Sequence, residues 1–270
     1  MGIEAGTAVL PYYEIDHPEI SCICAFPSPQ ETARGVAKEI MGLVRANPHM
    51  AITYATGETM IPLYSALATM VKHGEVDFSK TKAFHLDEYY PCSSDSPYSF
   101  ARYIGEKVFD PLKICEENRF LINGSAEDPE VETQRYNSLL GKQEIDLAIL
   151  GIGPGCHIGF NEQGTPFDKE THLATLSQET VYRDRKERGQ DTPEQAITQG
   201  ISNILNARKI LLLGYGSKKG EYLNSALIGS VTPNIPASAL RLVGDKVSIF
   251  IDSEAAKSIG CFGNYKKPKE

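Results

Sequence analysis

The chain has 270 residues, of which 41% are hydrophobic and 23% charged. This composition can bury a full core and excludes an intrinsically disordered protein. The formal net charge of −8 argues against nucleic acid or an anionic membrane as the main partner. Because there is no apolar run of about 18 residues and no signal-peptide pattern at the N-terminus, we expect neither a membrane span nor secretion.

Six cysteines, at positions 22, 24, 92, 115, 156 and 261, are scattered along the chain. This usage is typical of reduced thiols in a cytoplasmic protein and not of a disulfide framework. Cys22 and Cys24 alternate within "ISCICAF", which places both side chains on one face of a strand. With no second cysteine or histidine pair at zinc spacing, they are interpreted as small buried residues and no metal site is expected.

The first half of the chain alternates strand and helix patterns. Ser28, Pro29 and Glu31 form a capping box at the start of the first helix. Further helices are expected at 61–72 and 98–109, and strands at 20–26, 50–55, 82–86 and 119–122.

The second half continues this alternation, with helices expected at 129–141, 192–205 and 218–229 and strands at 145–151, 172–176, 209–214 and 246–252. Thr192 and Pro193 supply the cap and first residue of the helix at 192–205. Apolar strands in such an order predict an α/β fold with a mainly parallel sheet covered by helices on both faces. One domain is expected over 1–270, with 1–19 as an N-terminal extension.

Ligands bind at the carboxyl ends of strands in such sheets, so the turns after the strands are the candidate site. The turn "ATGET" offers Thr56, Gly57, Glu58 and Thr59 just before a helix, where backbone amides and the helix dipole favour a phosphate. A simple helix cap is the alternative. The turn "GYGSKKG" brings Lys218 and Lys219, which are either a solvated surface pair or a second part of the same phosphate site.

Two further turns carry acid–base groups. Asp87 and Glu88 follow the strand at 82–86 and serve either as a cap for the next segment or as a general base. In "GIGPGCHIGFNEQG", residues 151–164, Glu162 can orient the imidazole of His157 and raise its basicity. The alternative for His157 is a core histidine bonded to a backbone carbonyl.

Other interpretations of this glycine-rich turn are disfavoured. Cys156 stands where a dinucleotide-binding motif needs its third glycine. Cys156 and His157 are adjacent, so their side chains diverge on an extended backbone and do not form a nucleophile–base pair. No histidine or cysteine accompanies them at metal-ligand spacing.

The segments "ATGET..PLY", "LDEYY", "GIGPGCHIGFNEQG", "GISNILNARKILLLGYGSKK" and "IPASAL" together resemble the glucosamine-6-phosphate deaminase family. The wider group includes galactosamine-6-phosphate isomerases and 6-phosphogluconolactonases. The resemblance is co-linear from about residue 30 to 256 and implies a three-layer α/β/α sandwich. It also implies conversion of an amino-sugar phosphate and water to a ketose phosphate and ammonia, with no metal or organic cofactor.

The resemblance assigns roles to individual residues. His157 would move a proton at the ring oxygen to open the pyranose, and Glu162 would tune its imidazole. Asp87 would take the proton from C2 and deliver it to C1, giving an enolamine that hydrolyses. Phosphate would be held by the family's turn and two basic residues, here Thr56, Gly57, the amide of Glu58, Thr59, Lys219 and Lys186.

Lys186 belongs to "VYRDRKERG", within residues 176–199, which the resemblance implies is a mobile lid over the substrate. The same segment offers Arg183, Arg185 and Arg188 as alternatives, and alignment with the family favours Lys186. The chain departs from the family at Gly155 and Cys156, where an Asp or Asn followed by Gly usually precedes the histidine, and at Glu58, where a small residue is usual. These positions, together with Glu88, are expected to line the site. Galactosamine 6-phosphate as substrate, a lactonase-like hydrolase and a non-catalytic sugar-phosphate-binding protein therefore stay open alternatives. A homo-oligomer is compatible with the resemblance.

Overall fold

The computed structural model describes residues 13–259 and 265–266. Nine strands form one sheet in the order β12-β1-β2-β11-β10-β7-β3-β4-β6. Neighbours from β2 to β6 run parallel, and β1 is antiparallel to β2 and to β12. The strands are β1 (Tyr13–Ile15), β2 (Cys22–Phe26), β3 (Ala51–Tyr54), β4 (Lys82–His85), β6 (Arg119–Phe120), β7 (Leu147–Gly151), β10 (Lys209–Gly214), β11 (Val247–Asp252) and β12 (Tyr265–Lys266). The end of the expected N-terminal extension thus adds a strand, whereas residues 1–12 lie outside the described residues.

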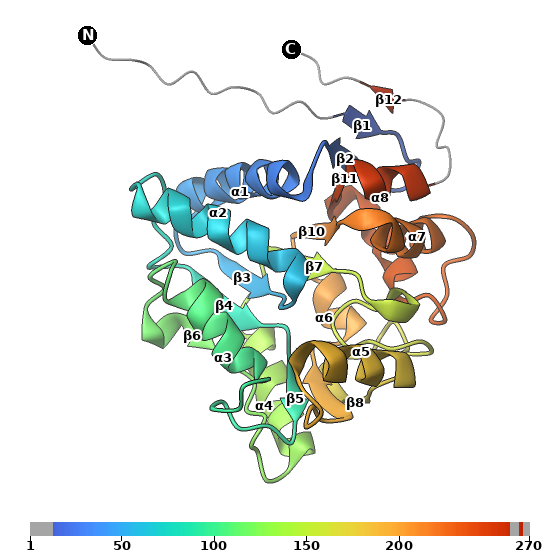
Figure 1. Ribbon diagram of the computed structural model, residues 1–270. Coiled ribbons are helices and arrows are strands. Elements are labelled where there is room, and N and C mark those ends of the chain that lie inside the picture. Colours follow the sequence, from blue (N-terminus) through green and yellow to red (C-terminus); the bar gives the residue numbers. More distant parts are fainter. Residues whose placement is uncertain (1–12, 260–264, 267–270) are drawn as a thin grey trace.

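Helices cover both faces of this sheet. In Figure 1, α1 and α2 lie on one side of the strands and α7 and α8 on the other. The helices are α1 (Pro29–Ala46), α2 (Ile61–Lys72), α3 (Phe100–Ile104), α4 (Pro129–Gly141), α5 (Gln178–Arg188), α6 (Ile201–Leu205), α7 (Gly216–Leu227) and α8 (Ser253–Ser258). The predicted α/β fold, with a mainly parallel sheet between helices in one domain, is confirmed. None of the described helices has the length and apolar character needed to cross a membrane.

Local sequence signals place several helix ends. The Ser28 hydroxyl accepts a hydrogen bond from the Glu31 amide at the start of α1, as the capping box predicts. Helices α2 and α4 have the expected bounds, and each carries proline in its first turn. The helix expected at 98–109 is present as α3, followed by a π-helical turn over Gly105–Phe109.

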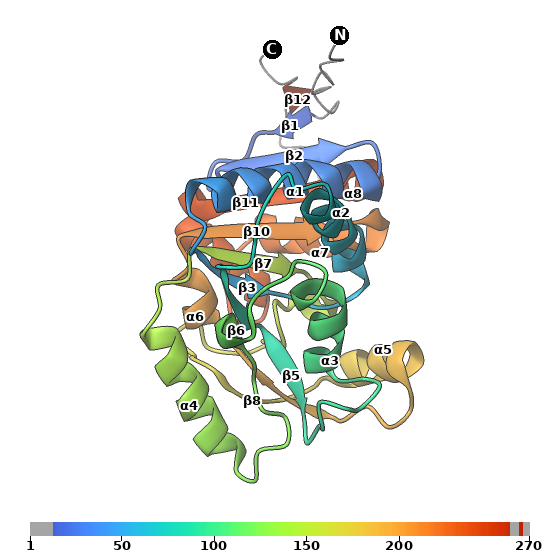
Figure 2. The same ribbon diagram turned by 90° about the vertical axis from the view of Figure 1, so that its left-hand side faces the viewer.

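The helix predicted at 192–205 is wrong. A three-stranded antiparallel sheet contains β9 (Gln195–Thr198) between β5 (Asp87–Tyr90) and β8 (His172–Thr175), and the short α6 follows it. Figure 2 shows β5 and β8 beside the lower end of the larger sheet. Because β9 pairs along both edges and buries Ala196 and Ile197 completely, long-range pairing outweighs the local signal of Thr192 and Pro193.

The small sheet positions the site. Leu86 alone separates β4 from β5, so the chain leaves the carboxyl end of β4 and at once enters the small sheet. Asp87 is therefore held as the first residue of β5, paired in register with Thr198. This junction lies at the same edge as the carboxyl ends of β3, which pairs with β4, and of β7, which pairs with the other side of β3.

Candidate active site

A cavity of about 180 Å³ opens at this edge of the sheet. The residues that line it come from the segments that follow β3, β4, β7 and β10, from the start of α3 and from α5. Those proposed from the sequence are Thr56, Gly57, Glu58, Thr59, Asp87, His157 and Lys219. Four segments far apart in the sequence therefore contribute to one cavity, as expected at the carboxyl edge of a parallel sheet.

The turn after β3 forms an anion cradle. Gly57 has φ +106°, a conformation that glycine adopts without strain, and a short 3-10 helix begins at Glu58 directly before α2. Backbone amides at the start of consecutive helical turns carry partial positive charge and suit a phosphate. The Glu58 side chain is exposed, so its carboxylate need not oppose an anion bound at the amides.

Lys219 faces the cradle from α7. Its ammonium donates to the backbone carbonyl of Ile152. Burial lowers the pKa of Lys219 to about 8, and the nearby positive charge of Arg183 acts in the same direction. The side chain is still largely protonated at neutral pH, and a bound phosphate would stabilise that charge.

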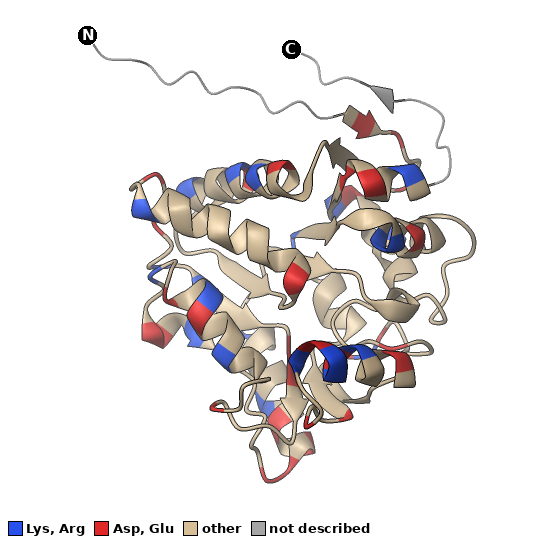
Figure 3. Cartoon of the chain, viewed as in Figure 1, with Lys and Arg blue, Asp and Glu red and all other residues tan. Residues whose placement is uncertain are grey.

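Helix α5 closes one side of the cavity with a face that carries both charges (Figure 3). This face consists of Arg183, Asp184, Glu187 and Arg188. Lys186 does not reach the cavity, because it lies on another face of α5 and lines a separate surface hollow with Tyr182 and Arg185. Arg183 and Arg188, and not Lys186, are thus the basic residues of α5 that line the cavity.

A buried contact ties α5 to the small sheet. The Tyr89 hydroxyl of β5 donates to Asp184 Oδ2 at 2.7 Å, and Arg183 pairs with Asp184 Oδ1 at 2.6 Å. Asp184 is only 1% exposed. The Tyr89 contact therefore holds α5 beside the strand that carries Asp87 in this conformation, and Arg183 balances the charge of the buried carboxylate.

Asp87 has the properties of a general base. It is buried, and its Oδ1 has no hydrogen-bond partner among the described residues. Burial, followed by the negative charges of Glu88 and Asp184, raises the pKa of Asp87 to about 7, while Arg188 and Arg183 oppose the rise. A carboxylate that titrates near neutrality can both accept and return a proton.

Glu88 has a different task from its neighbour. Its carboxylate accepts hydrogen bonds from the Ser99 hydroxyl and from the amides of Phe100 and Ala101, at the start of α3. The alternation of side chains along β5 turns Glu88 away from the cavity that Asp87 lines. The sequence offered a helix cap or a general base for Asp87 and Glu88. Glu88 is the cap and does not line the cavity, which leaves Asp87 as the candidate base.

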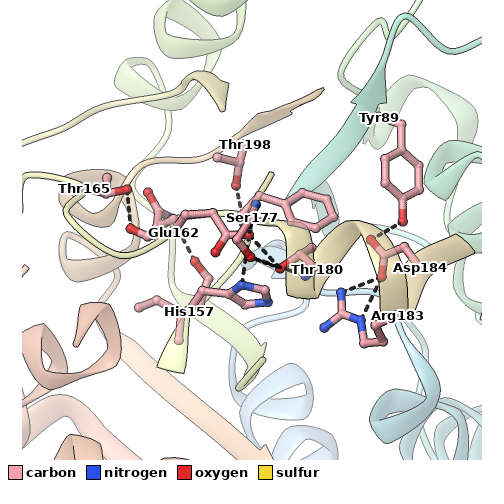
Figure 4. A network of polar contacts seen from close by, with 12 residues as sticks. Tyr89, His157, Glu162, Thr165, Ser177, Thr180, Arg183, Asp184 and Thr198 are labelled. Atoms are coloured by element: carbon pink, nitrogen blue, oxygen red, sulfur yellow. Dashed lines mark hydrogen bonds and ion pairs between the residues drawn. The ribbon is translucent and has the colours of Figure 1, made fainter. Parts of the chain in front are cut away.

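His157 and Glu162 form a pair beside the cavity (Figure 4). His157 Nδ1 lies 3.5 Å from Glu162 Oε1. The same oxygen accepts from the Thr180 hydroxyl at 2.7 Å and from the Ser177 amide at 3.2 Å, both at the start of α5. Burial lowers the pKa of His157, although Glu162 opposes this effect. Burial would raise the pKa of Glu162, but the bonds from His157, Thr180 and Ser177 hold it below its ordinary value.

Gly153 is a site residue that sequence reasoning missed. A Cβ atom on Gly153 would lie 1.8 Å from His157 Nε2, so only glycine leaves room for the imidazole. The signal in the sequence is the second glycine of "GIGPG", four residues before His157. Arg183 and Arg188 belong to the basic residues of the lid segment, but the sequence does not predict which face of the helix they occupy.

Gly155 and Cys156 turn away from the cavity. Both have positive φ, +63° and +62°, and neither lines the cavity. The Cys156 thiol contacts the backbone carbonyl of Tyr222, and burial raises its pKa, which keeps it protonated. Among the described residues, Glu162 is the carboxylate that contacts His157.

The sequence is similar to known proteins of one family. Residues 28–249 match the family described as glucosamine-6-phosphate isomerases/6-phosphogluconolactonase. A glucosamine-6-phosphate deaminase of Clostridium botulinum (strain Kyoto / Type A2) is 38% identical over 85% of this chain and 95% of its own. One from Thermoanaerobacter sp. (strain X514) is 37% identical over 85% and 92%.

Solved structures show the same relationship. A monomeric glucosamine-6-phosphate deaminase superposes with a TM-score of 0.84 at 32% identity, covering 87% of this chain and 99% of its own. A 6-phosphogluconolactonase from Trypanosoma brucei superposes with a TM-score of 0.69, covering 88% of this chain and 98% of its own. Its identity of 19% makes it a relative in fold only.

Proposed function

Because the chain belongs to the glucosamine-6-phosphate isomerase/6-phosphogluconolactonase family, we propose that it deaminates a hexosamine 6-phosphate, with glucosamine 6-phosphate as the default substrate. The observation that carries the proposal is the buried Asp87 in the same cavity as His157. A lactonase needs no base for a C2 proton, whereas deamination by isomerisation does. The relatives at 37–38% identity bear the deaminase name.

The phosphate would bind where the cavity concentrates positive charge. The amides of Gly57, Glu58 and Thr59, with the hydroxyls of Thr56 and Thr59, would donate to its oxygens. Lys219, Arg183 and Arg188 supply the cations around the same cavity. Fixing the phosphate would hold the sugar ring between Asp87 and His157.

Ring opening comes first, because the C2 proton becomes acidic only beside a free carbonyl. His157 would move the proton between the C1 hydroxyl and the ring oxygen, which breaks the C1–O5 bond. Burial disfavours the charged imidazole, so His157 starts neutral and can accept a proton. Glu162, next to Nδ1, would stabilise the imidazolium that forms transiently.

Asp87 would then perform the isomerisation. The ionised carboxylate takes the proton from C2 while O1 gains a proton that the C2 ammonium group of the substrate loses, so the C2–H electron pair forms the C1=C2 bond of a neutral enolamine. Return of the proton from Asp87 to C1 gives the C2 iminium, which water hydrolyses to the ketone with release of ammonia. These steps use only protein side chains and water, and a positioned acid or base of this kind contributes about 10²–10⁴-fold each.

Residues 176–199 contain the proposed lid. Within them, α5 carries Arg183 and Arg188, and the start of this helix donates hydrogen bonds to Glu162. The strand β9, in contrast, is the central strand of the small sheet. We assign the lid movement to α5 and its flanking turns, because β9 is held on both edges. Closure over the phosphate would exclude water from the C2 chemistry.

Three candidate substrates, assayed in parallel, test the proposed function. Ammonia release is measured from glucosamine 6-phosphate and galactosamine 6-phosphate, and acid release from 6-phosphogluconolactone. Ammonia from the gluco or galacto epimer supports the deaminase and identifies the sugar. Lactone hydrolysis without ammonia would replace the proposal with a lactonase, and binding without turnover would indicate a sugar-phosphate sensor.

A further inference from the structure

Two thiols and a carboxylate meet at the outer part of the large sheet. The Sγ atoms of Cys22 and Cys24 lie 2.8 Å apart on β2. Glu14 of β1 stands directly opposite Cys24 in the antiparallel register, and its carboxylate and both sulfurs all lie within 4.8 Å of one another. We propose that Glu14, Cys22 and Cys24 form a binding site for a thiophilic divalent cation of the Zn²⁺ type.

A disulfide between the two cysteines is disfavoured by the strand. Residues i and i+2 of an extended strand have Cα atoms about 6.6 Å apart, near the upper limit of about 6.8 Å for a disulfide. The backbone cannot shorten this span easily, because β2 pairs with β1 on one side and β11 on the other. Both cysteines are free, so their sulfurs remain available as ligands.

The donor set suits a soft cation. Two thiolates at about 2.3 Å from a tetrahedral Zn²⁺ lie about 3.8 Å apart. The two sulfurs must therefore separate by about 1 Å, which rotation of the half-buried Cys22 side chain can supply. The Glu14 carboxylate becomes the third ligand, and water can take the fourth position.

The contact between the sulfurs also matters for binding. The two Sγ atoms share a hydrogen bond at 2.8 Å, and a metal ion that binds both sulfurs displaces the protons that the thiols carry.

The charged side chains of residues 13–259 do not neutralise Glu14. None of them forms an ion pair with its carboxylate. Glu39 and Lys209 are the other charged groups near Cys22, and they pair with each other at 2.7 Å. A divalent cation would neutralise the charge that Glu14 brings to this half-buried position.

The site is separate from the proposed active site and does not depend on the proposed function. Figure 1 shows β1 and β2 at the opposite side of the molecule from β5 and α5. A bound ion would join β1 to β2, so its expected effect is on stability. Activity of the distant cavity should be unchanged.

Cadmium is the direct probe, because Cd²⁺–thiolate bonds absorb in the ultraviolet. Titration of the reduced full-length protein should give one equivalent of bound Cd²⁺ and a charge-transfer band. Cys22→Ser and Cys24→Ser should each lose the tight site, and Glu14→Gln should bind at least about tenfold more weakly. Cys115→Ser, a half-buried cysteine elsewhere, is the matched control and should bind like the wild type.

Thermal unfolding gives a second readout. Zn²⁺ should raise the Tm of the wild type and of Cys115→Ser but not the Tm of Cys22→Ser. The Tm of Cys22→Ser without metal shows whether this variant folds. A band that survives in the Cys22→Ser/Cys24→Ser double variant, or no tight Cd²⁺ binding by the wild type, would overturn the site. Unchanged affinity in Glu14→Gln would overturn the carboxylate as a ligand.

Discussion

The Thr180 hydroxyl at the start of α5 donates to Glu162 Oε1 at 2.7 Å, the same oxygen that faces His157 Nδ1 at 3.5 Å. The helix that carries Arg183 and Arg188 into the wall of the cavity is therefore bonded to Glu162, the partner of the imidazole. This arrangement links the position of α5 to the acid–base pair. Closure of α5 on the phosphate and alignment of His157 would then occur together.

Thr180→Val tests this link, because valine keeps the shape of the side chain and removes the donor. We expect kcat to fall about tenfold or more, since a hydrogen bond to a charged group contributes about 1.5–3 kcal/mol. Thr180→Ser should restore most of the rate. The pH dependence of kcat should also change, because loss of the Thr180 hydrogen bond should raise the pKa of Glu162. Equal kcat in the valine variant and the wild type would show that α5 does not position Glu162.

The pH dependence of kcat/KM should report Asp87. The base acts only when ionised, and its pKa is raised to about 7, so activity should be lost as the pH falls through about 7. Arg188 lowers this pKa, and Arg188→Gln should therefore move the acid limb to higher pH. Lys186→Gln, on another face of α5, should leave the limb in place. An acid limb that stays fixed in Arg188→Gln would argue that another group controls it.

Phosphate affinity should distinguish the two faces of α5. Arg188→Gln is expected to raise KM by about 10–100-fold, the effect of losing one charge-assisted contact. Lys186→Gln should change KM by no more than about twofold, because its side chain lies outside the cavity. Steady-state kinetics of both variants with one sugar phosphate is the measurement. A larger effect at Lys186 would mean that α5 turns another face to the substrate.

Gly153→Ala should disable the site through His157. The new methyl group would overlap the imidazole, which must move out of its place. We expect activity to fall by at least about 100-fold, the size of a typical general acid–base contribution. Gly42→Ala is the matched control, because its Cβ meets nothing within 4 Å in the interior of α1. This variant should retain activity. Its free energy of unfolding should rise by about 1 kcal/mol or less, which gives a slightly higher Tm.

Local signals allowed much of the fold to be predicted. Proline in the first turn and an apolar face mark α2 and α4 within the sequence itself, and their bounds agree with the prediction. The strand β9 could not be predicted in this way, because its pairing with β5 and β8 involves residues 20 or more positions away. Thr192 and Pro193 are local helix signals that this pairing overrides.

Some residues of the candidate site could be predicted from local sequence signals, and others could not. Asp87, His157 and Lys219 follow strands and could be placed at the edge of the sheet from the sequence alone. The cationic face of α5 could not, since this helix is so polar that no apolar stripe marks its buried side. Glu14 next to Cys24 was equally hidden, because it depends on the register of two antiparallel strands.

The role of Asp87 is tested most directly by ammonia release from glucosamine 6-phosphate by the Asp87→Asn variant. Asparagine has nearly the same shape but cannot take the C2 proton. The proposed mechanism predicts a fall in kcat of about 10²–10⁴-fold, with an unchanged unfolding curve and retained binding of the sugar phosphate. Ammonia release within a few-fold of the wild-type rate would contradict the assignment of Asp87 as the base and, with it, the mechanism.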